Sequence, residues 1–257
     1  MNRQHHFSQK HSRKPTLHLV IGNRAVMEVL HHKAKHISVL YLAKGEKLLS
    51  DDIRKMVNET KIKVETLSKD ELTALTGTDS HQGIGALMKG ESRLSLDEFI
   101  IKAKREERSF MVALDSIFDP QNLGAILRAS ECFGASAVMW SKNRGADLTP
   151  SATKASAGAS ELMDIIKVSN LAESLTLLRG AGFEIVAADA AVDATPLNQF
   201  RFDKKTVLIL GSEGEGIRPL LLKLADHKVY IPMQGKIDSL NVSQAAATIL
   251  SWWSLTV

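Results

Sequence analysis

Hydrophobic positions in the first third of the chain alternate between the two-residue period of strands and the 3.6-residue period of helices. Short apolar runs predict four strands, at residues 17–21, 37–42, 63–67 and 84–88. Helical spacing occupies the segments between them, at residues 24–31, 53–58 and 68–75. We therefore expect a small domain of mixed helices and strands at this end of the chain.

From Phe110 onward, strand and helix patterns follow one another regularly. Apolar runs predict six further strands, at residues 110–114, 137–140, 165–168, 184–188, 206–210 and 228–231. Asp119-Pro120 and Thr149-Pro150 each place a capping side chain before a proline, which is typical of a helix start, and a last helix is predicted over residues 241–254. This alternation predicts an α/β fold with a parallel sheet covered by helices on both faces.

A charged segment separates the two patterns. Ser95-Leu96-Asp97-Glu98 has the form of a capping box and predicts a helix that runs toward Arg108. We divide the chain accordingly into four parts: a basic arm (1–16), a first domain (17–92), a linker helix (93–109) and a second domain (110–257).

Composition is that of an ordinary globular protein. Of 257 residues, 44% are hydrophobic and 24% are charged. No segment approaches the roughly 18 consecutive apolar residues of a membrane span, and the first residues lack the apolar core of a secretory signal. One cysteine, Cys132, leaves no internal disulfide and no CxxC pair for zinc. We expect a cytoplasmic protein that binds neither a membrane nor a metal.

The net charge is concentrated in the arm. The chain has 33 basic and 29 acidic residues, hence +4, and the arm alone carries Arg3, Lys10, Arg13 and Lys14 without an acid. Such an arm is attracted to polyanions such as nucleic acid, or it is a solvated tail without a partner. The net charge alone therefore identifies no partner.

The first candidate cluster spans residues 114–135, LDSIFDPQNLGAILRASECFGA, where a strand leads into a helix. Asn122 and Arg128 lie around the start of that helix, and we expect both near the end of the strand. Ligands of such sheets bind beyond the carboxyl ends of strands. The planar guanidinium of Arg128 suits a phosphate, although it could instead pair with Asp115 or Asp119.

The second cluster spans residues 207–219, VLILGSEGEGIRP, where a buried strand enters a glycine-rich turn. The glycine spacing is GxxGxG rather than GxGxxG, which argues against a nicotinamide oxidoreductase. Glu213 and Glu215 would also repel a pyrophosphate. The turn suits a ligand with hydroxyl or ammonium groups, or it is a purely structural turn.

The third cluster spans residues 230–250, YIPMQGKIDSLNVSQAAATIL. Ser239, Asn241 and Ser243 precede or open an alanine-rich helix, and Ser239 or Asn241 could simply cap it. The small residues of the helix allow close packing, either within the chain or between subunits.

Together the three clusters carry a family resemblance. NLGAILRASECFGA, LGSEGEGIRP and IPMQGKIDSLNVSQAA resemble the three ordered motifs of the SpoU (TrmH-like) RNA 2'-O-methyltransferases of the SPOUT class. KASAGASEL resembles an intermediate segment of the same family, and IGNRAVMEVL and HQGIGAL resemble the L30e-like RNA-binding domain of its rRNA branch. The resemblance implies an L30e-like domain followed by a SPOUT domain with a deep trefoil knot, an otherwise rare feature.

The resemblance also implies a function. The chain would transfer a methyl group from S-adenosyl-L-methionine to a ribose 2'-hydroxyl of RNA, and it is most similar to the branch that modifies a guanosine of bacterial 23S rRNA. A tRNA ribose methyltransferase and a non-catalytic RNA-binding protein of the same fold are the alternatives. Family members are homodimers with the last helix in the contact, so RNA and a second copy are the expected partners.

Site residues follow from the matched motifs. The resemblance implies a catalytic group of Arg128, Asn122, Glu213, Ser239 and Asn241. The cofactor would be bound by Leu210, Gly211, Ile231, Met233 and Leu240, and the RNA by Arg128, Lys154 and Ser243. A guanidinium keeps its proton up to a pH of about 12. We therefore expect Arg128 to hold the RNA phosphate and favour the developing alkoxide, and the proton acceptor stays unassigned.

Overall fold

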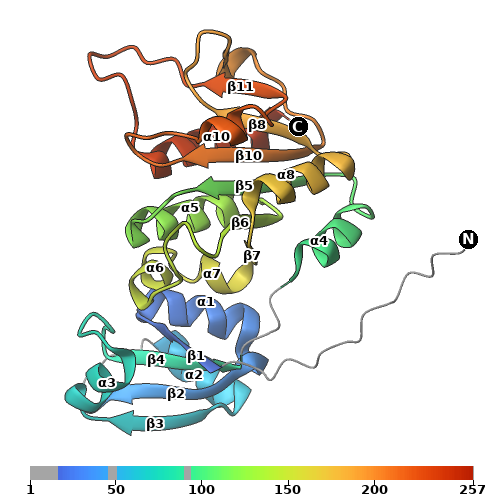
Figure 1. Cartoon of the computed structure of the whole chain (residues 1–257). Helices are drawn as coiled ribbons and strands as arrows, with labels where there is room; N and C mark the ends of the chain where they lie inside the picture. The colour runs from blue at the N-terminus through green and yellow to red at the C-terminus, as the bar shows by residue number, and fades with distance from the viewer. Residues whose placement is uncertain (1–16, 46–50, 90–93, 257) are drawn as a thin grey trace, which may run out of the picture.

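The computed structural model describes residues 17–45, 51–89 and 94–256. Two sheets form the protein, one in each half of the chain, and helices α1, α6 and α7 lie between them (Figure 1). The predicted arm over residues 1–16 lies outside the described residues.

The first sheet has four strands in the order β1-β4-β2-β3. Its strands are β1 (Leu17–Ile21), β2 (Ile37–Ala43), β3 (Lys63–Leu67) and β4 (Ile84–Lys89). The accompanying helices are α1 (Asn23–Lys33), the short η1 (Ala34–His36), α2 (Asp51–Thr60) and α3 (Lys69–Thr76). β4 pairs antiparallel with β1 and β2, whereas β3 is parallel to β2. All four predicted strands are present, and Ser68 caps α3 through a capping box with Glu71.

The second sheet has seven strands in the order β7-β6-β5-β10-β8-β11-β9, and every pairing is parallel. The strands are β5 (Ser109–Asp115), β6 (Ala137–Ser141), β7 (Asp164–Val168), β8 (Glu184–Ala188), β9 (Thr195–Pro196), β10 (Lys205–Gly211) and β11 (His227–Tyr230). The predicted parallel sheet is thus confirmed. Sequence patterning did not predict β9, since two residues are too few to show a period.

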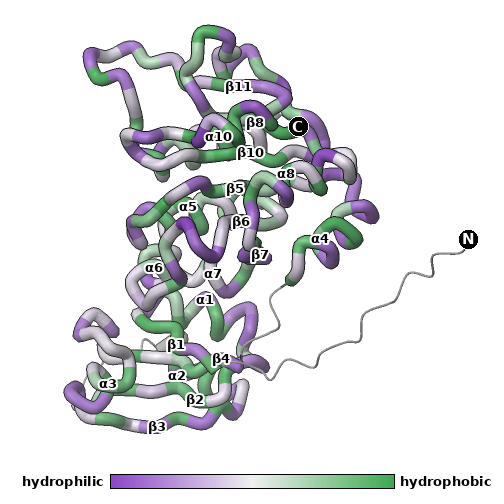
Figure 2. Tube along the Cα trace, in the orientation of Figure 1, coloured by the Kyte–Doolittle hydropathy of each residue, from purple (hydrophilic) through white to green (hydrophobic). Residues whose placement is uncertain are grey.

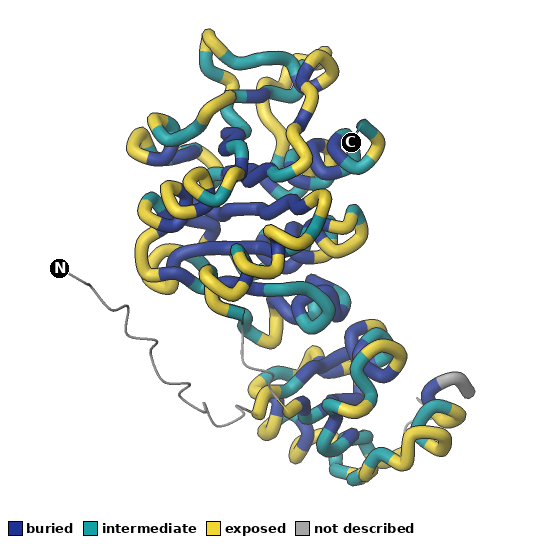
Figure 3. Tube along the Cα trace, turned by 90° about the vertical axis from the view of Figure 1, so that its right-hand side faces the viewer, coloured by how far each residue is buried: buried dark blue, intermediate teal, exposed yellow. Residues whose placement is uncertain are grey.

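Helices cover both faces of this sheet. They are α4 (Leu96–Ala103), α5 (Pro120–Cys132), α6 (Pro150–Ala155), α7 (Ala159–Leu162), α8 (Leu171–Gly180), α9 (Pro219–Leu222) and α10 (Val242–Thr256), with the short η2 (Leu197–Gln199) near β9. Alternate residues of β5 face opposite layers: Phe110 packs with α5 and α10, and Met111 packs with α4 and α8. The central strands are therefore largely apolar and buried on both sides (Figures 2 and 3).

The linker helix α4 is shorter than predicted. It starts at the expected capping box of Ser95 and Glu98 but ends at Ala103 instead of continuing toward Arg108. Phe99 and Ala103 are its buried residues, and those that follow are mostly exposed charged side chains, which offer little apolar surface to pack a helix on the sheet. No helix in the described part of the chain is long and apolar enough to cross a membrane.

The deep trefoil knot stays a prediction, because strand order does not by itself define how the chain threads. Close packing around the first motif is evident, however. A Cβ added at Gly124 of α5 would lie 2.5 Å from the carbonyl oxygen of Ala152 and 2.5 Å from the Cβ of Ala155 in α6. Glycine at this position therefore permits α5 and α6 to approach each other.

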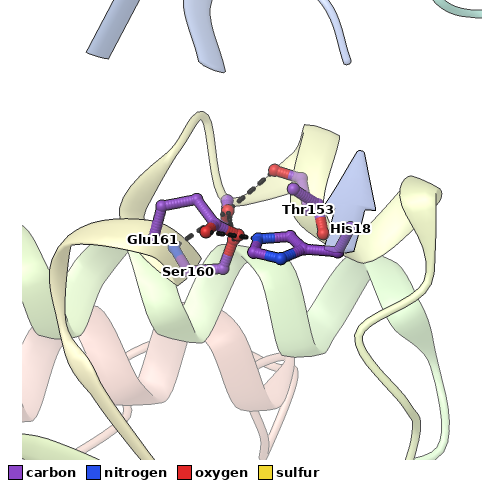
Figure 4. A network of polar contacts seen from close by, with 5 residues as sticks. His18, Thr153, Ser160 and Glu161 are labelled. Carbon is purple, nitrogen blue, oxygen red and sulfur yellow. Dashed lines mark hydrogen bonds and ion pairs between the residues drawn. The ribbon is translucent and has the colours of Figure 1, made fainter. Parts of the chain in front are cut away.

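The two domains contact each other directly. His18 Nε2 of β1 lies 2.7 Å from Glu161 Oε2 of α7, in a polar network that continues through Ser160 toward Thr153 (Figure 4). At the same junction Gly158 has a φ of +94°, and a Cβ there would lie 2.9 Å from Glu28 Cβ of α1. Glycine meets both requirements, the left-handed backbone and the close approach.

Candidate active site

The site is built where β5 and β10 end. These strands are neighbours in the middle of the sheet, and their parallel register pairs Gly211 with Asp115. The loops that follow them therefore begin side by side at the carboxyl edge of the sheet, where ligands of such sheets bind.

The loop after β10 folds back tightly on itself. Ser212 and Gly216 exchange two backbone hydrogen bonds, of 3.2 and 3.0 Å. A Cβ added at Gly211 would lie only 2.2 Å from the carbonyl carbon of Gly216, so no larger residue fits there. Glycine at position 211 is therefore required by the structure of the turn, and the turn exposes Glu213 at the edge of the sheet.

A buried ion pair fixes the far end of this loop. The Asp115 side chain, fully buried at the end of β5, accepts hydrogen bonds from Arg218 Nε at 2.7 Å and from the Arg218 backbone N–H at 2.9 Å. Asp119 instead caps α5 by accepting from the Gln121 N–H at 3.0 Å. The alternative that Arg128 pairs with Asp115 or Asp119 is therefore wrong.

Three side chains from distant parts of the sequence meet beside this loop. Asn122 Nδ2 donates to Glu213 Oε1 at 3.2 Å. Asn241 Nδ2 donates to Asn122 Oδ1 at 3.0 Å and also to Glu213 Oε1. We refer to Asn122, Glu213 and Asn241 as the Asn–Glu–Asn cluster. One residue from each of the three sequence motifs thus contributes to a single hydrogen-bonded group.

Asn241 has two roles in this arrangement. It precedes α10, and its Oδ1 accepts from the backbone N–H of Ser243 at 2.8 Å and from the Ser243 hydroxyl at 2.6 Å. A backbone N–H can only donate, so it holds the amide oxygen toward the helix and turns Nδ2 toward Glu213. The capping interpretation of Asn241 is therefore supported by its hydrogen bonds, and its catalytic role stays a prediction.

Three other predicted site residues lie outside this cluster. Ser239 is exposed, and its hydroxyl donates to Asp238 at 3.3 Å. Arg128 is exposed on α5, without a hydrogen bond or ion pair to any other described residue. Lys154 of α6 lines a cavity between the two domains. Within the described part of one chain, the Arg128 side chain therefore makes no hydrogen bond to the cluster.

The residues predicted to bind the cofactor surround the same edge. Leu210 is buried at the end of β10, and Ile231 directly follows β11. Met233 and Leu240 are 36% and 37% exposed on the segment between β11 and α10. The space around Gly214 and Gly216 is open. Open space beside partly exposed apolar side chains can hold a ligand that has both polar and apolar parts.

Sequence reasoning missed two features of this region. One is the Asp115–Arg218 ion pair. The sequence signal for it was Asp115 at the end of an apolar strand, because a buried carboxylate needs a partner. The other is the cavity between the domains. Among the residues that the structure describes, no group of three or more His, Cys, Asp or Glu side chains could hold a metal ion.

Comparison with known proteins identifies relatives over most of the chain. The SpoU rRNA Methylase family matches residues 109–251, and the family described as RNA 2'-O ribose methyltransferase substrate binding matches residues 19–93. The 23S rRNA (guanosine-2'-O-)-methyltransferase RlmB of Acinetobacter baylyi is 32% identical, over 89% of this chain and 93% of that protein. A putative TrmH family tRNA/rRNA methyltransferase of Staphylococcus epidermidis is 34% identical, over 90% and 93%.

A solved structure has the same fold. The SpoU methyltransferase AviRb from Streptomyces viridochromogenes, in complex with the cofactor AdoMet, superimposes with a TM-score of 0.75 at 23% identity. The match covers 93% of this chain and 89% of the other. Both sheets of the chain therefore occur together in a known architecture.

Proposed function

Since this chain belongs to the SpoU rRNA methylase family, whose members are RNA 2'-O-ribose methyltransferases, we propose that its substrate is a guanosine of 23S rRNA. The observation that supports methyl transfer at this site is the Asn–Glu–Asn cluster, which unites one residue from each family motif at the carboxyl edge of the sheet. The relative from A. baylyi, named for a 23S rRNA guanosine, supports the choice of substrate.

We assign the methyl donor S-adenosyl-L-methionine to the loops next to the cluster. Bound there, it supplies a methyl carbon attached to a positively charged sulfur. The fit is favourable because the space around Gly214 and Gly216 is open, and the Met233 and Leu240 side chains are partly exposed. Leu210, Gly211 and Ile231 complete the set of residues that would hold it.

The cluster itself would orient the ribose. The exposed Glu213 carboxylate and the Asn122 amide offer acceptors and donors for sugar hydroxyls, and Ser243 holds Asn241 in place behind them. Orientation of two reactants can contribute roughly 7–11 kcal/mol to a reaction of this kind. Ser239, exposed nearby in sequence, is assigned to the same surface as a further hydroxyl.

Arg128 would act from a second copy of the chain. It is exposed on α5 and makes no polar contact with other described residues of its own chain. In a homodimer that includes α5 and α10, the guanidinium of one protomer would hold the RNA phosphate at its partner's cluster and favour the alkoxide. We therefore propose a homodimer as the active form.

The remaining parts of the chain follow from this assignment. Residues 17–92 would bind the RNA, residues 93–109 would link the domains, and residues 110–257 would perform the transfer. The basic arm over residues 1–16 would add attraction to RNA phosphates. The place of action would be the cytoplasm, where large-subunit rRNA is found.

Two other functions remain candidates. The relative from S. epidermidis, whose name covers both tRNA and rRNA, favours a tRNA ribose as the second candidate substrate. A non-catalytic RNA-binding protein is the other alternative, and the complete Asn–Glu–Asn cluster argues against it.

One experiment distinguishes these functions. Calorimetry of the purified protein with S-adenosyl-L-methionine tests cofactor binding, and transfer of a labelled methyl group to transcribed 23S rRNA or to tRNA tests the substrate. We expect binding of the cofactor and labelling of 23S rRNA. Labelling of tRNA alone would reassign the substrate, and absence of cofactor binding would support the non-catalytic alternative.

A further inference from the structure

A cavity of about 460 Å³ lies between the two domains. The first domain contributes the end of β1 and the segment between α3 and β4, and the second contributes the starts of α5 and α6. The residues that define its chemistry are Ile21, Thr78, Ser80, Gln121, Ser151 and Lys154. This volume falls within the range of about 300–1,000 Å³ that is typical of ligand sites.

The walls of this cavity are held in place by contacts across the junction. The His18–Glu161 pair joins β1 to α7 (Figure 4). Glu28 of α1 lies close to Gly158. Beside the cavity, a Cβ added at Gly22 would lie 3.8 Å from the side chain of Lys154. The cavity is therefore a formed site between two packed domains.

The lining is suited to an anion with polar edges. Lys154 is the one charged residue among the described residues that line the cavity, and its amine has no hydrogen bond or ion pair with other described residues. A lysine ammonium is a common phosphate ligand. Hydroxyls of Thr78 and Ser151 can donate to or accept from a base, and Ile21 adds an apolar surface.

The cavity is next to the Asn–Glu–Asn cluster. Gln121 lines it and directly precedes Asn122 in α5, and Gln121 Nε2 donates to Ser151 Oγ of α6 at 2.9 Å. In Figure 1 the carboxyl ends of β5 and β10 point to the side where α6 and α3 also lie. An RNA strand that places a ribose at the cluster would therefore bring a neighbouring nucleotide to the cavity.

From these observations we propose that the cavity binds one nucleotide of the RNA strand beside the methylated nucleotide, with its phosphate at Lys154. The proposal rests on the proposed function, because it takes RNA as the ligand. It makes both domains part of one recognition site, with Thr78 and Ser80 of the first domain and Lys154 of the second contacting the same nucleotide.

Binding of transcribed 23S rRNA at several salt concentrations tests this proposal. Lys154→Ala should weaken binding about tenfold and reduce the slope of log affinity against log salt by about 0.7, the value for one single-strand phosphate contact. Lys204→Ala, which removes an exposed lysine paired with Glu107 at the opposite edge of the sheet, is the charge-matched control and should change neither quantity.

A second pair of variants tests the volume of the cavity. Ser80→Trp should fill it and raise the KM for RNA at least tenfold with unchanged cofactor affinity, whereas Ala74→Trp on the exposed side of α3 should behave as wild type. An unchanged KM for Ser80→Trp, or an unchanged salt slope for Lys154→Ala, would overturn the nucleotide site. Failure of the wild-type protein to bind cofactor or methylate RNA would instead overturn the proposed function.

Discussion

The carboxylate of Asp115 accepts hydrogen bonds from both the backbone and the side chain of Arg218, and so joins the end of β5 to the loop that carries Glu213. Asp115 is fully buried in this pair, while the Arg218 side chain is 36% exposed. Because α5 follows β5 directly, the pair fixes the position of Glu213 relative to Asn122. The hydrogen bonds of the candidate active site therefore depend on a contact that is not itself part of the site.

Loss of the arginine of this pair should destabilise the protein strongly. Arg218→Ala leaves a buried carboxylate without its partner, which typically costs about 3–5 kcal/mol. Asp115→Asn should cost less, because the remaining guanidinium reaches solvent. Urea unfolding of both variants measures the difference. Equal losses, or a loss below about 1 kcal/mol for Arg218→Ala, would contradict this account.

The role of Arg128 predicts a loss of activity without a loss of cofactor. Arg128→Ala should reduce methyl transfer at least a hundredfold, because the phosphate clamp is removed, while the affinity for S-adenosyl-L-methionine stays within about twofold. Arg105→Ala, at an exposed position after α4, serves as the control for lost positive charge. Full activity of Arg128→Ala would refute the assignment.

Two substitutions at Asn241 separate its capping role from its role in the cluster. Asn241→Ala removes both, so it should lose activity and about 0.5–2 kcal/mol of stability. Asn241→Asp keeps the cap on α10 but places a second carboxylate beside Glu213, so it should be inactive with nearly normal stability. Thermal unfolding and methyl-transfer assays measure the two effects. An active Asn241→Asp variant would show that the Asn241 amide is dispensable.

The pH dependence of stability should include a contribution from Glu184, at the start of β8. Burial raises the pKa of this carboxyl above its ordinary value, against the opposing effects of the Asp203 N–H and His227. The folded state therefore favours the protonated carboxyl of Glu184. Its contribution to the free energy of unfolding is fully present below the ordinary pKa of a glutamate and is lost as the pH rises through the raised pKa. Glu184→Gln should make unfolding free energies less dependent on pH and slightly higher near neutrality. A neutral-pH stability below that of the wild type would contradict this.

Much of the second sheet could be predicted from sequence because its strands are apolar on both faces and several of its helices begin with clear capping residues. Proline after Asp119 or Thr149 marks the start of α5 and α6 correctly. The short strand β9 and helix α7 could not be predicted, because two to four residues contain no measurable period.

The relation between Asn122 and Arg128 shows a limit of reasoning from spacing. Both were expected near the end of the strand, yet six residues of a helix span about 9 Å and differ by about 120° around its axis. Asn122 consequently joins Glu213, whereas Arg128 lies elsewhere on the exposed surface of α5. The end of an apolar strand at Asp115 indicates that this acid needs a partner, but nothing local in the sequence indicates that the partner is Arg218.

Methylation of a 23S rRNA guanosine can be tested in the cell by mapping the 2'-O-methyl groups of total RNA. RNA from cells with the gene, without it, and with an Arg128→Ala copy would be compared nucleotide by nucleotide. We expect one guanosine of 23S rRNA to lose its 2'-O-methyl group when the gene is absent, and the variant not to restore it. An unchanged rRNA map, or a lost modification confined to tRNA, would contradict the claim.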